Sequence, residues 1–193
     1  MVDDKSGLSS PDQDSFFSNQ GDGKFSADQI YYKPIGYVHS PYKDPNKTPI
    51  QPVFDNDSEG TIEILEEYAS GLKDLDGFSH LFVLYYLHKA TTVKMSVKPF
   101  LQDVERGIFA TRAPCRPNPI GLSIVKLKEV EGNILHIVGV DILDGTAVLD
   151  IKPYCEQFDK VSDPRCGWQD ELDDEEVQRR GKRLDQQNKG PFE

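Results

Sequence analysis

The chain has 193 residues, of which 37% are hydrophobic and 28% are charged, and its formal net charge is −11. This length is sufficient for one domain with a substantial hydrophobic core. No apolar run approaches the roughly 18 residues that a membrane-spanning helix needs, so the sequence predicts no transmembrane helix. The first residues lack the basic start and apolar centre of a signal peptide. We therefore expect a cytoplasmic protein.

The cysteines and histidines do not have the spacing of a metal centre. Three cysteines form an odd number without a Cys-x-x-Cys pair, and the four histidines also lack ligand spacing. Zinc sites and disulfide frameworks both depend on such patterns. The sequence therefore predicts reduced thiols and no bound metal.

The negative charge lies mostly at the two ends of the chain. Residues 1–30 carry six acids and two bases, and residues 154–193 carry eleven acids and seven bases. Residues 89–116, in contrast, hold six bases and only two acids. Contacts with phosphates need local rather than global positive charge. The segment 89–116 is therefore compatible with RNA binding.

In chain order, the first 30 residues are polar and glycine-rich, which is typical of a disordered tail. Strands are expected at 31–39 and 61–68, separated by a proline-rich irregular loop at 40–52. A helical turn is expected at 69–76. Together these patterns indicate that the folded part begins near residue 31.

Residues 78–88 are apolar at nearly every position, which predicts a strand that is buried on both faces. A hairpin is expected from 122–129 and 134–140, and a second from the apolar stretches within 139–154 around a turn at Asp144-Gly145. Short strands without a long helical period predict a mainly β fold, namely a single domain with a closed or nearly closed sheet, short helices and flexible tails. We expect this domain at 31–168. Residues 169–193 should form a charged tail, with a short helix at 170–187.

The run from Gly107 to Gly121, GIFATRAPCRPNPIG, has the composition of a binding site. A strand-like stretch at 108–111 leads into a loop in which three prolines fix the backbone of 113–119. A simple connecting loop needs turn residues but no charged side chains in a stiff frame. A proline-rich connector with solvated arginines is the alternative interpretation. The polar side chains that the loop holds are Arg112, Arg116 and Asn118.

The run from Gly139 to Tyr154, GVDILDGTAVLDIKPY, brings three aspartates close to one turn. They are Asp141, Asp144 and Asp150. We expect Arg112 and Asp144 to face each other across the mouth of the β-structure, and Asp150 to lie on a solvated strand face.

Four sequence blocks resemble, in order, the TrmO/YaeB (TsaA-like) family. They are SPYKDPNKTPIQP at 40–52, GFSHLFVLYYLH at 77–88, the proline-arginine run and DILDGTAVLDIKPY. The resemblance covers roughly residues 32–170. It implies an S-adenosylmethionine-dependent tRNA adenine-N6 methyltransferase with a small β-barrel unrelated to Rossmann-type methyltransferases. The chain accordingly has no Gly-x-Gly-x-x-Gly after a strand.

The resemblance also implies which positions contact the cofactor and which substrate is used. The acceptor would be the exocyclic amine of a threonylcarbamoylated adenosine at tRNA position 37, in the anticodon loop, and the protein would be a homodimer. The implied contacts with S-adenosylmethionine are Gln51, Pro52, Val53, Leu87, His88, Arg112, Leu122, Ile142, Leu143, Asp144 and Gly145.

Our hypotheses for individual roles come from side-chain chemistry. Arg112 suits a bidentate pair with a carboxylate or phosphate. Asp144 suits a ribose hydroxyl or an adenine amine, and either Asp144 or His88 would accept the proton. Asn118 would orient the acceptor amine through its carbonyl. Arg116 would contact the anticodon-loop backbone or the carboxylate of the modification.

Two other functions remain open at this stage. The protein could methylate another RNA or a small molecule, which the net charge of −11 favours. Alternatively, it could bind S-adenosylmethionine without catalysis. Transfer of methyl groups to bulk tRNA separates the first hypothesis from these two.

Overall fold

The structure is a computed structural model that describes residues 30–181. The chain divides into two units, Met1–Tyr32 and Lys33–Glu193, and all described helices and strands belong to the second. The predicted N-terminal tail, except Ile30, and residues 182–193 lie outside the described residues. Within the described part, no helix has the length and apolar character needed to cross a bilayer.

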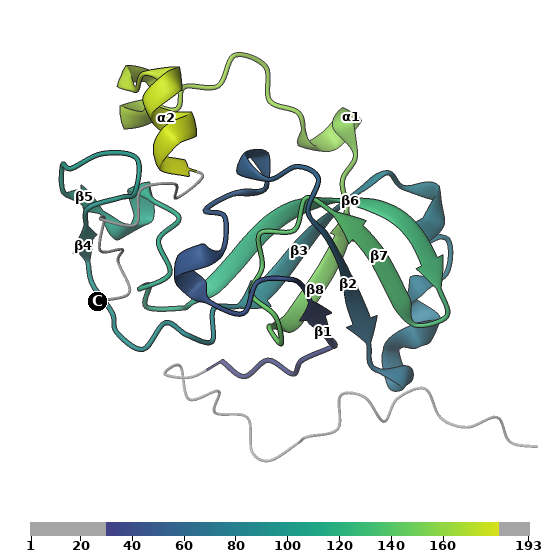
Figure 1. Ribbon diagram of the computed structural model, residues 1–193. Helices are drawn as coiled ribbons and strands as arrows, with labels where there is room; N and C mark the ends of the chain where they lie inside the picture. Colours follow the sequence, from purple (N-terminus) through teal and green to yellow (C-terminus); the bar gives the residue numbers. More distant parts are fainter. Residues whose placement is uncertain (1–29, 182–193) are drawn as a thin grey trace, which may run out of the picture. The chain divides into compact units, whose positions relative to one another are not determined.

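Six antiparallel strands close into a barrel in the order β1-β2-β7-β6-β3-β8 (Figure 1). Two further strands, β4 (Ser96–Val97) and β5 (Arg106–Gly107), form a separate ladder. The predicted mainly β barrel is therefore confirmed. The barrel strands are β1 (Gly36–His39), β2 (Glu59–Ile64), β3 (His80–Tyr86), β6 (Ile120–Glu131), β7 (Ile134–Val138) and β8 (Ala147–Pro153).

The helices are short, as expected. Within residues 30–181, two are α-helical, namely α1 (Glu156–Asp159) and α2 (Asp174–Gly181). The α2 helix lies within the predicted charged segment 170–187, and its acids precede its bases as the helix dipole favours. The 3-10 helices are Pro45–Lys47, Pro52–Phe54, Glu66–Leu72, Leu75–Gly77, Ile108–Ala110 and Gly167–Glu171.

The core fills the barrel because successive side chains of a strand point to opposite faces. In β6, residues alternate between exposed and buried from Ile120 to Lys128. Gly121 in this strand pairs with Tyr85, and a Cβ at Gly121 would lie only 2.2 Å from Tyr85 Cε2. The glycine therefore makes room for the tyrosine ring inside the barrel. The core side chains are Val38, Ile62, Ile64, Leu81, Val83, Tyr85, Val125, Leu127, Leu135, Ile137, Val140, Ile142 and Val148.

Three strand predictions were only partly correct. The strand expected at 31–39 begins only at Gly36, where the pairing of β1 with β2 and β8 starts. The β3 strand is buried on its inner face alone, because an antiparallel barrel covers one face of each strand with its core. The β2 strand ends at Ile64 instead of residue 68, because its partner β7 begins at Ile134. The Ile64 N–H therefore bonds to the carbonyl of Asn133 in the turn, and a 3-10 helix follows.

The hairpin between β6 and β7 is confirmed, but the hairpin around Asp144-Gly145 was a wrong prediction. Residues 139–146 fold back as a loop, while β8 pairs with β1 and β3. The backbone N–H groups of Asp144 and Gly145 bond to the carbonyls of Tyr42 and Val38. Those contacts with β1 and the loop after it take the place of a local strand ladder.

The start of the proline-arginine run is also not a strand. Ile108–Ala110 is a 3-10 helix, closed by a bond from the Thr111 N–H to the Ile108 carbonyl. Ile108 is buried with Val97 and Cys115 in a second small apolar cluster. This cluster anchors the loop on the β4–β5 ladder outside the barrel.

Candidate active site

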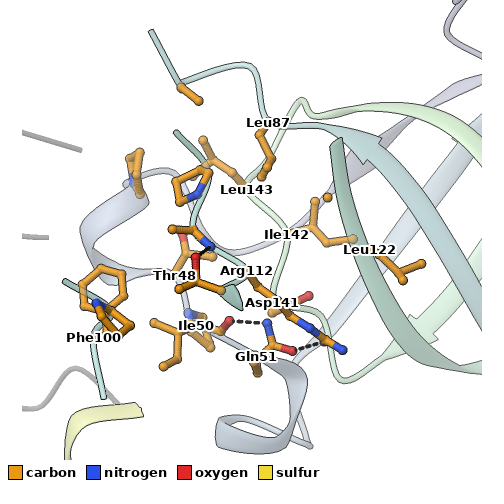
Figure 2. A pocket seen from close by; sticks show the side chains of 18 of the residues that line it. Thr48, Ile50, Gln51, Leu87, Phe100, Arg112, Leu122, Asp141, Ile142 and Leu143 are labelled. Atoms are coloured by element: carbon orange, nitrogen blue, oxygen red, sulfur yellow. Dashed lines mark hydrogen bonds between the residues drawn. The ribbon is translucent and has the colours of Figure 1, made fainter. Parts of the chain in front are cut away.

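A cavity of about 680 Å³ opens where β3 ends and β6 begins (Figure 2). Five other segments complete its lining. They are the loop after β1, residues 99–101 between β4 and β5, the proline-arginine loop, the turn before β8 and the C-terminal segment that contains α2. The predicted site residues that line the cavity are Gln51, Val53, Leu87, His88, Arg112, Arg116, Leu122, Ile142 and Leu143.

Arg112 is joined to the loop after β1. Its Nη1 donates a hydrogen bond to Gln51 Oε1 over 2.6 Å, and Gln51 Nε2 donates to the Ile50 carbonyl over 2.7 Å (Figure 2). The glutamine is thereby held with its oxygen towards the guanidinium. Arg112 is itself exposed and retains donors for an anionic ligand.

Arg116 holds the shape of the loop. Its Nη1 lies within hydrogen-bond distance of the carbonyls of Ile108, Thr111 and Ala113, at 3.3, 2.8 and 3.3 Å. Its guanidinium also lies over the ring of Phe109, 6.0 Å from the centroid. A guanidinium used in this way stiffens the backbone beside the cavity.

Asp144 is not among the residues that line the cavity, and neither are Pro52, Gly145 and Asn118. The Asp144 carboxylate accepts from the Ser40 N–H at 3.0 Å and lies 2.5 Å from Lys43 Nζ. The hydrogen bond from Lys43, followed by that from Ser40, lowers the pKa of Asp144. The structure therefore gives Asp144 contacts with the loop after β1, whereas Arg112 lines the cavity.

Asp141 lines the cavity, whereas Asp144 does not, although the sequence analysis gave Asp141 no role. It is 8% exposed, and its Oδ1 accepts a 2.6 Å hydrogen bond from Ser123 Oγ. The hydroxyl of Tyr85 lies 3.1 Å from the same Ser123 oxygen. Burial raises the pKa of Asp141 to about 6. A sequence signal existed, because Asp141 stands alone between the apolar residues Val140 and Ile142.

His88 lines the cavity at the end of β3. Its Nδ1 lies 3.3 Å from the hydroxyl of Thr146, which belongs to the turn before β8. Burial, followed by the charge of Lys89, lowers the pKa of His88. The imidazole is therefore neutral near pH 7 and can donate or accept a hydrogen bond.

The C-terminal segment supplies one wall of the cavity through Trp168, Gln169 and Val177. Trp168 Nε1 donates to the Ala110 carbonyl over 2.8 Å, and the guanidinium of Arg106 lies 5.7 Å from the centre of the indole ring. Trp168 therefore packs beside the proline-arginine loop.

Two contacts of α2 hold this wall in place. Arg180 lies 3.0 Å from the Asp103 carboxylate and 2.5 Å from that of Glu176, and its side chain is only 17% exposed. Gly181 lies against the ring of Phe54, where a Cβ would be 2.2 Å from Cε1. No sequence motif had indicated these contacts.

The arrangement defines a small-molecule site. The cavity lies within the range of about 300–1,000 Å³ that is usual for such sites, with apolar walls and a few convergent polar groups. Residues 37–160 match the family model of the tRNA-methyltransferase O N-terminal domain. The chain therefore belongs to this family.

Similar proteins extend this finding. A probable S-adenosyl-L-methionine-binding protein of Pyrococcus abyssi is 51% identical over 139 residues, which cover 72% of this chain and 76% of the relative. A human tRNA (adenine(37)-N6)-methyltransferase is 37% identical over 134 residues, covering 66% of this chain but only 30% of that protein. The chain thus corresponds to less than a third of the human relative.

The crystal structure of TrmO from Pseudomonas aeruginosa has the same fold. It superposes with a TM-score of 0.61 at 37% sequence identity, over 72% of this chain and 62% of that one. The match to the family model ends at residue 160, before the segment that forms the C-terminal wall of the cavity. Trp168, Gln169 and Val177 therefore lie outside the family match.

Proposed function

We propose that the protein is an S-adenosylmethionine-dependent methyltransferase. Its substrate would be adenosine 37 in the anticodon loop of a tRNA, and this adenosine would already carry a threonylcarbamoyl group. The methyl group would be transferred to the exocyclic amine of that adenosine. The family and the name of the human relative support this reaction. The observation that carries the proposal is one cavity that combines apolar walls, an arginine held by a glutamine and a buried carboxylate.

The residues present fit S-adenosylmethionine. When bound, the cofactor supplies an electrophilic methyl group on a sulfonium. Arg112, held by Gln51, would bind a carboxylate, and Leu87, Ile142 and Leu143 would cover apolar ligand atoms and exclude water. His88, neutral near pH 7, would orient a polar group of the ligand.

Methyl transfer requires alignment more than covalent catalysis, so a rigid site is an advantage. Arg116 provides part of that rigidity through its bonds with three loop carbonyls. Asn118 is exposed and stands between Arg116 and Ile120, both of which line the cavity. We assign Asn118 to the acceptor amine, which it would orient from the side on which RNA arrives. We assign Asp144 and Gly145 to holding the turn before β8.

The RNA would approach over the segment 89–116, which holds six bases and two acids. Phe109 in this segment is 73% exposed, and Arg116 lies over its ring. Exposed aromatic side chains in a basic setting stack on unpaired bases, and an anticodon loop presents such bases. This combination supports RNA as the partner.

We also propose a homodimer. The outer face of β6 exposes Ile120, Leu122 and Ile124, which are 39–45% exposed. Their cross-strand partners on β3 are Tyr86, Leu84 and Phe82. A second copy would cover this apolar stripe, and sedimentation of the purified protein would reveal the dimer.

The test of the proposed reaction is direct. The protein is incubated with S-adenosylmethionine labelled in its methyl group and with tRNA that either carries or lacks the threonylcarbamoyl group. After digestion, mass spectrometry identifies the methylated nucleoside, and a transcript with guanosine at position 37 is the control. We expect label only in the modified adenosine 37. Label in another nucleoside would support a different substrate, and binding without transfer would support a non-catalytic protein.

A further inference from the structure

One ionisable group of the cavity has no part in the roles assigned above. Among the described residues that line the cavity, Asp141 is the only carboxylate. It comes from the turn before β8, lies between the core residues Val140 and Ile142, and is 8% exposed. A carboxylate is rarely buried without a partner, because its desolvation is costly. Its position on a ligand cavity therefore calls for a chemical explanation.

A chain of hydroxyl groups fixes this carboxylate. Ser123 Oγ donates to Asp141 Oδ1 over 2.6 Å, so the serine oxygen is left to accept from the Tyr85 hydroxyl at 3.1 Å. Both hydroxyls are buried and come from the neighbouring strands β6 and β3. The hydroxyl groups on these two strands thus fix the orientation of the Asp141 carboxylate, as a pre-organised catalytic group requires.

The charges around Asp141 suit a base that works near neutral pH. The charge of Arg112 acts on Asp141 from the proline-arginine loop, and both side chains belong to the lining of the same cavity (Figure 2). The other titratable groups coupled to it are Tyr85 on β3 and Tyr42 in the loop after β1, and both have raised pKa values. Both tyrosines are therefore neutral. The hydrogen bond from Ser123, a backbone hydrogen bond and the charge of Arg112, in that order, oppose the effect of burial on the pKa of Asp141.

We propose that Asp141 is the catalytic base that removes the proton from the acceptor amine during methyl transfer. The inference rests on the proposed function, since it concerns the same reaction. The amine nitrogen uses its lone pair to form the new bond with the methyl carbon, and the pair of the broken carbon–sulfur bond moves to sulfur. The nitrogen, positive at that point, loses its proton to the Asp141 carboxylate. The products are a methylated amine, a thioether and a protonated carboxyl group.

An aspartate with a raised pKa is better suited to this step than an ordinary one. A base is most effective when its pKa lies near the working pH, and burial raises the pKa of Asp141 to about 6. Asp144 has the opposite environment, since Lys43 and Ser40 lower its pKa. Ser123 and Tyr85 are positioning residues, because they act through Asp141.

The test compares Asp141→Asn with the wild-type protein and with Asp150→Asn. Asp150 is the matched control because it is 44% exposed and paired with Lys152 on β8. Single-turnover methyl transfer to modified tRNA is measured between pH 5 and pH 8, and binding of S-adenosylhomocysteine is measured by calorimetry. We expect Asp141→Asn to slow transfer about a hundredfold with its Kd changed less than threefold. The wild-type rate should rise with a midpoint near pH 6, and this rise should vanish in Asp141→Asn.

A second variant covers the case in which Asp141→Asn fails to fold. Ser123→Ala removes a hydrogen bond that lowers the pKa of Asp141, so the midpoint of the pH–rate profile should move upwards. Normal transfer by Asp141→Asn, an unchanged midpoint in Ser123→Ala, or a loss of ligand affinity equal to the loss of rate would overturn the role of Asp141 as the base. Absence of transfer by the wild-type protein would overturn the proposed function as well, so the two failures are distinguishable.

Discussion

Arg112 and Gln51 meet across the cavity although 61 residues separate them in the chain, with Arg112 Nη1 2.6 Å from Gln51 Oε1. The bond joins the proline-arginine loop to the loop after β1. Because the amide oxygen is already directed at the guanidinium, Arg112 is oriented before any ligand arrives. Pre-orientation of this kind reduces the entropic cost of binding.

Arg112→Ala is therefore expected to weaken binding of S-adenosylhomocysteine about tenfold to a hundredfold, as the loss of a charge-assisted hydrogen bond predicts. Calorimetry measures the Kd. Arg165→Ala, which replaces an exposed arginine that does not line the cavity, is the matched control. Equal affinities of the two variants would contradict the proposed role of Arg112 in ligand binding.

Asp144→Asn is expected to reduce methyl transfer far less than Asp141→Asn. The Asp144 carboxylate contacts Lys43 and the Ser40 N–H, and it does not line the cavity. Parallel single-turnover measurements on the two variants decide between the aspartates. A larger loss in Asp144→Asn would return the catalytic role to the residue that the sequence had suggested.

Asp141 should also destabilise the fold at neutral pH. Its folded pKa of about 6 lies above the ordinary value of 3.8, so the folded state binds the proton more tightly than the unfolded state. The tighter binding of this proton stabilises the folded state fully below pH 4, and this stabilisation is lost as the pH rises through 6. Relative to the wild type, Asp141→Asn should gain about 3 kcal/mol of unfolding free energy between pH 4 and pH 7. Urea titrations at both pH values measure this, and a pH-independent difference would contradict it.

The sequence could predict the barrel and much of the cavity lining because those features are local. Strand periodicity determines which side of β6 faces the core, and the proline-arginine run indicates Arg112, which lines the cavity. Neighbouring residues in the sequence do not determine that Asp141, and not Asp144, lines the cavity. This difference depends on the turn folding against Tyr42 and Val38 instead of forming a hairpin, and these partners are far away in the chain.

The C-terminal wall could not be predicted for a similar reason. The α2 helix has few apolar residues, and what attaches it is an ion pair between Arg180 and Asp103 together with the fit of Gly181 against Phe54. Neither partner is close in sequence. A sequence pattern therefore indicates the helix but not the surface on which it packs.

Gly181→Ala should displace this wall, because the added Cβ would lie 2.2 Å from Phe54 Cε1 in a buried position. We expect faster dissociation of S-adenosylhomocysteine, by about tenfold, since Val177 on the same helix lines the cavity. Stopped-flow displacement measures this rate. Gly71→Ala is the control, because a Cβ there meets nothing within 4 Å. Identical rates in both variants would show that the wall does not retain the ligand.

Phe109→Ala should weaken tRNA binding without changing the affinity for S-adenosylhomocysteine. Loss of one base–aromatic stack costs about 1–3 kcal/mol, so the Kd for tRNA should rise about fivefold or more. Filter binding with modified tRNA measures the effect. Phe158→Ala is the control, since Phe158 on α1 is 79% exposed but lies outside the basic segment 89–116. A weakened Phe158→Ala with a normal Phe109→Ala would place the RNA elsewhere.

The most direct test of the central claim is a crystal structure of the protein with S-adenosylhomocysteine. We predict the ligand inside the cavity, with its carboxylate on Arg112 and its sulfur on the side of the cavity where the Asp141 carboxylate lies. A ligand bound outside this cavity, or one that contacts neither residue, would contradict the account.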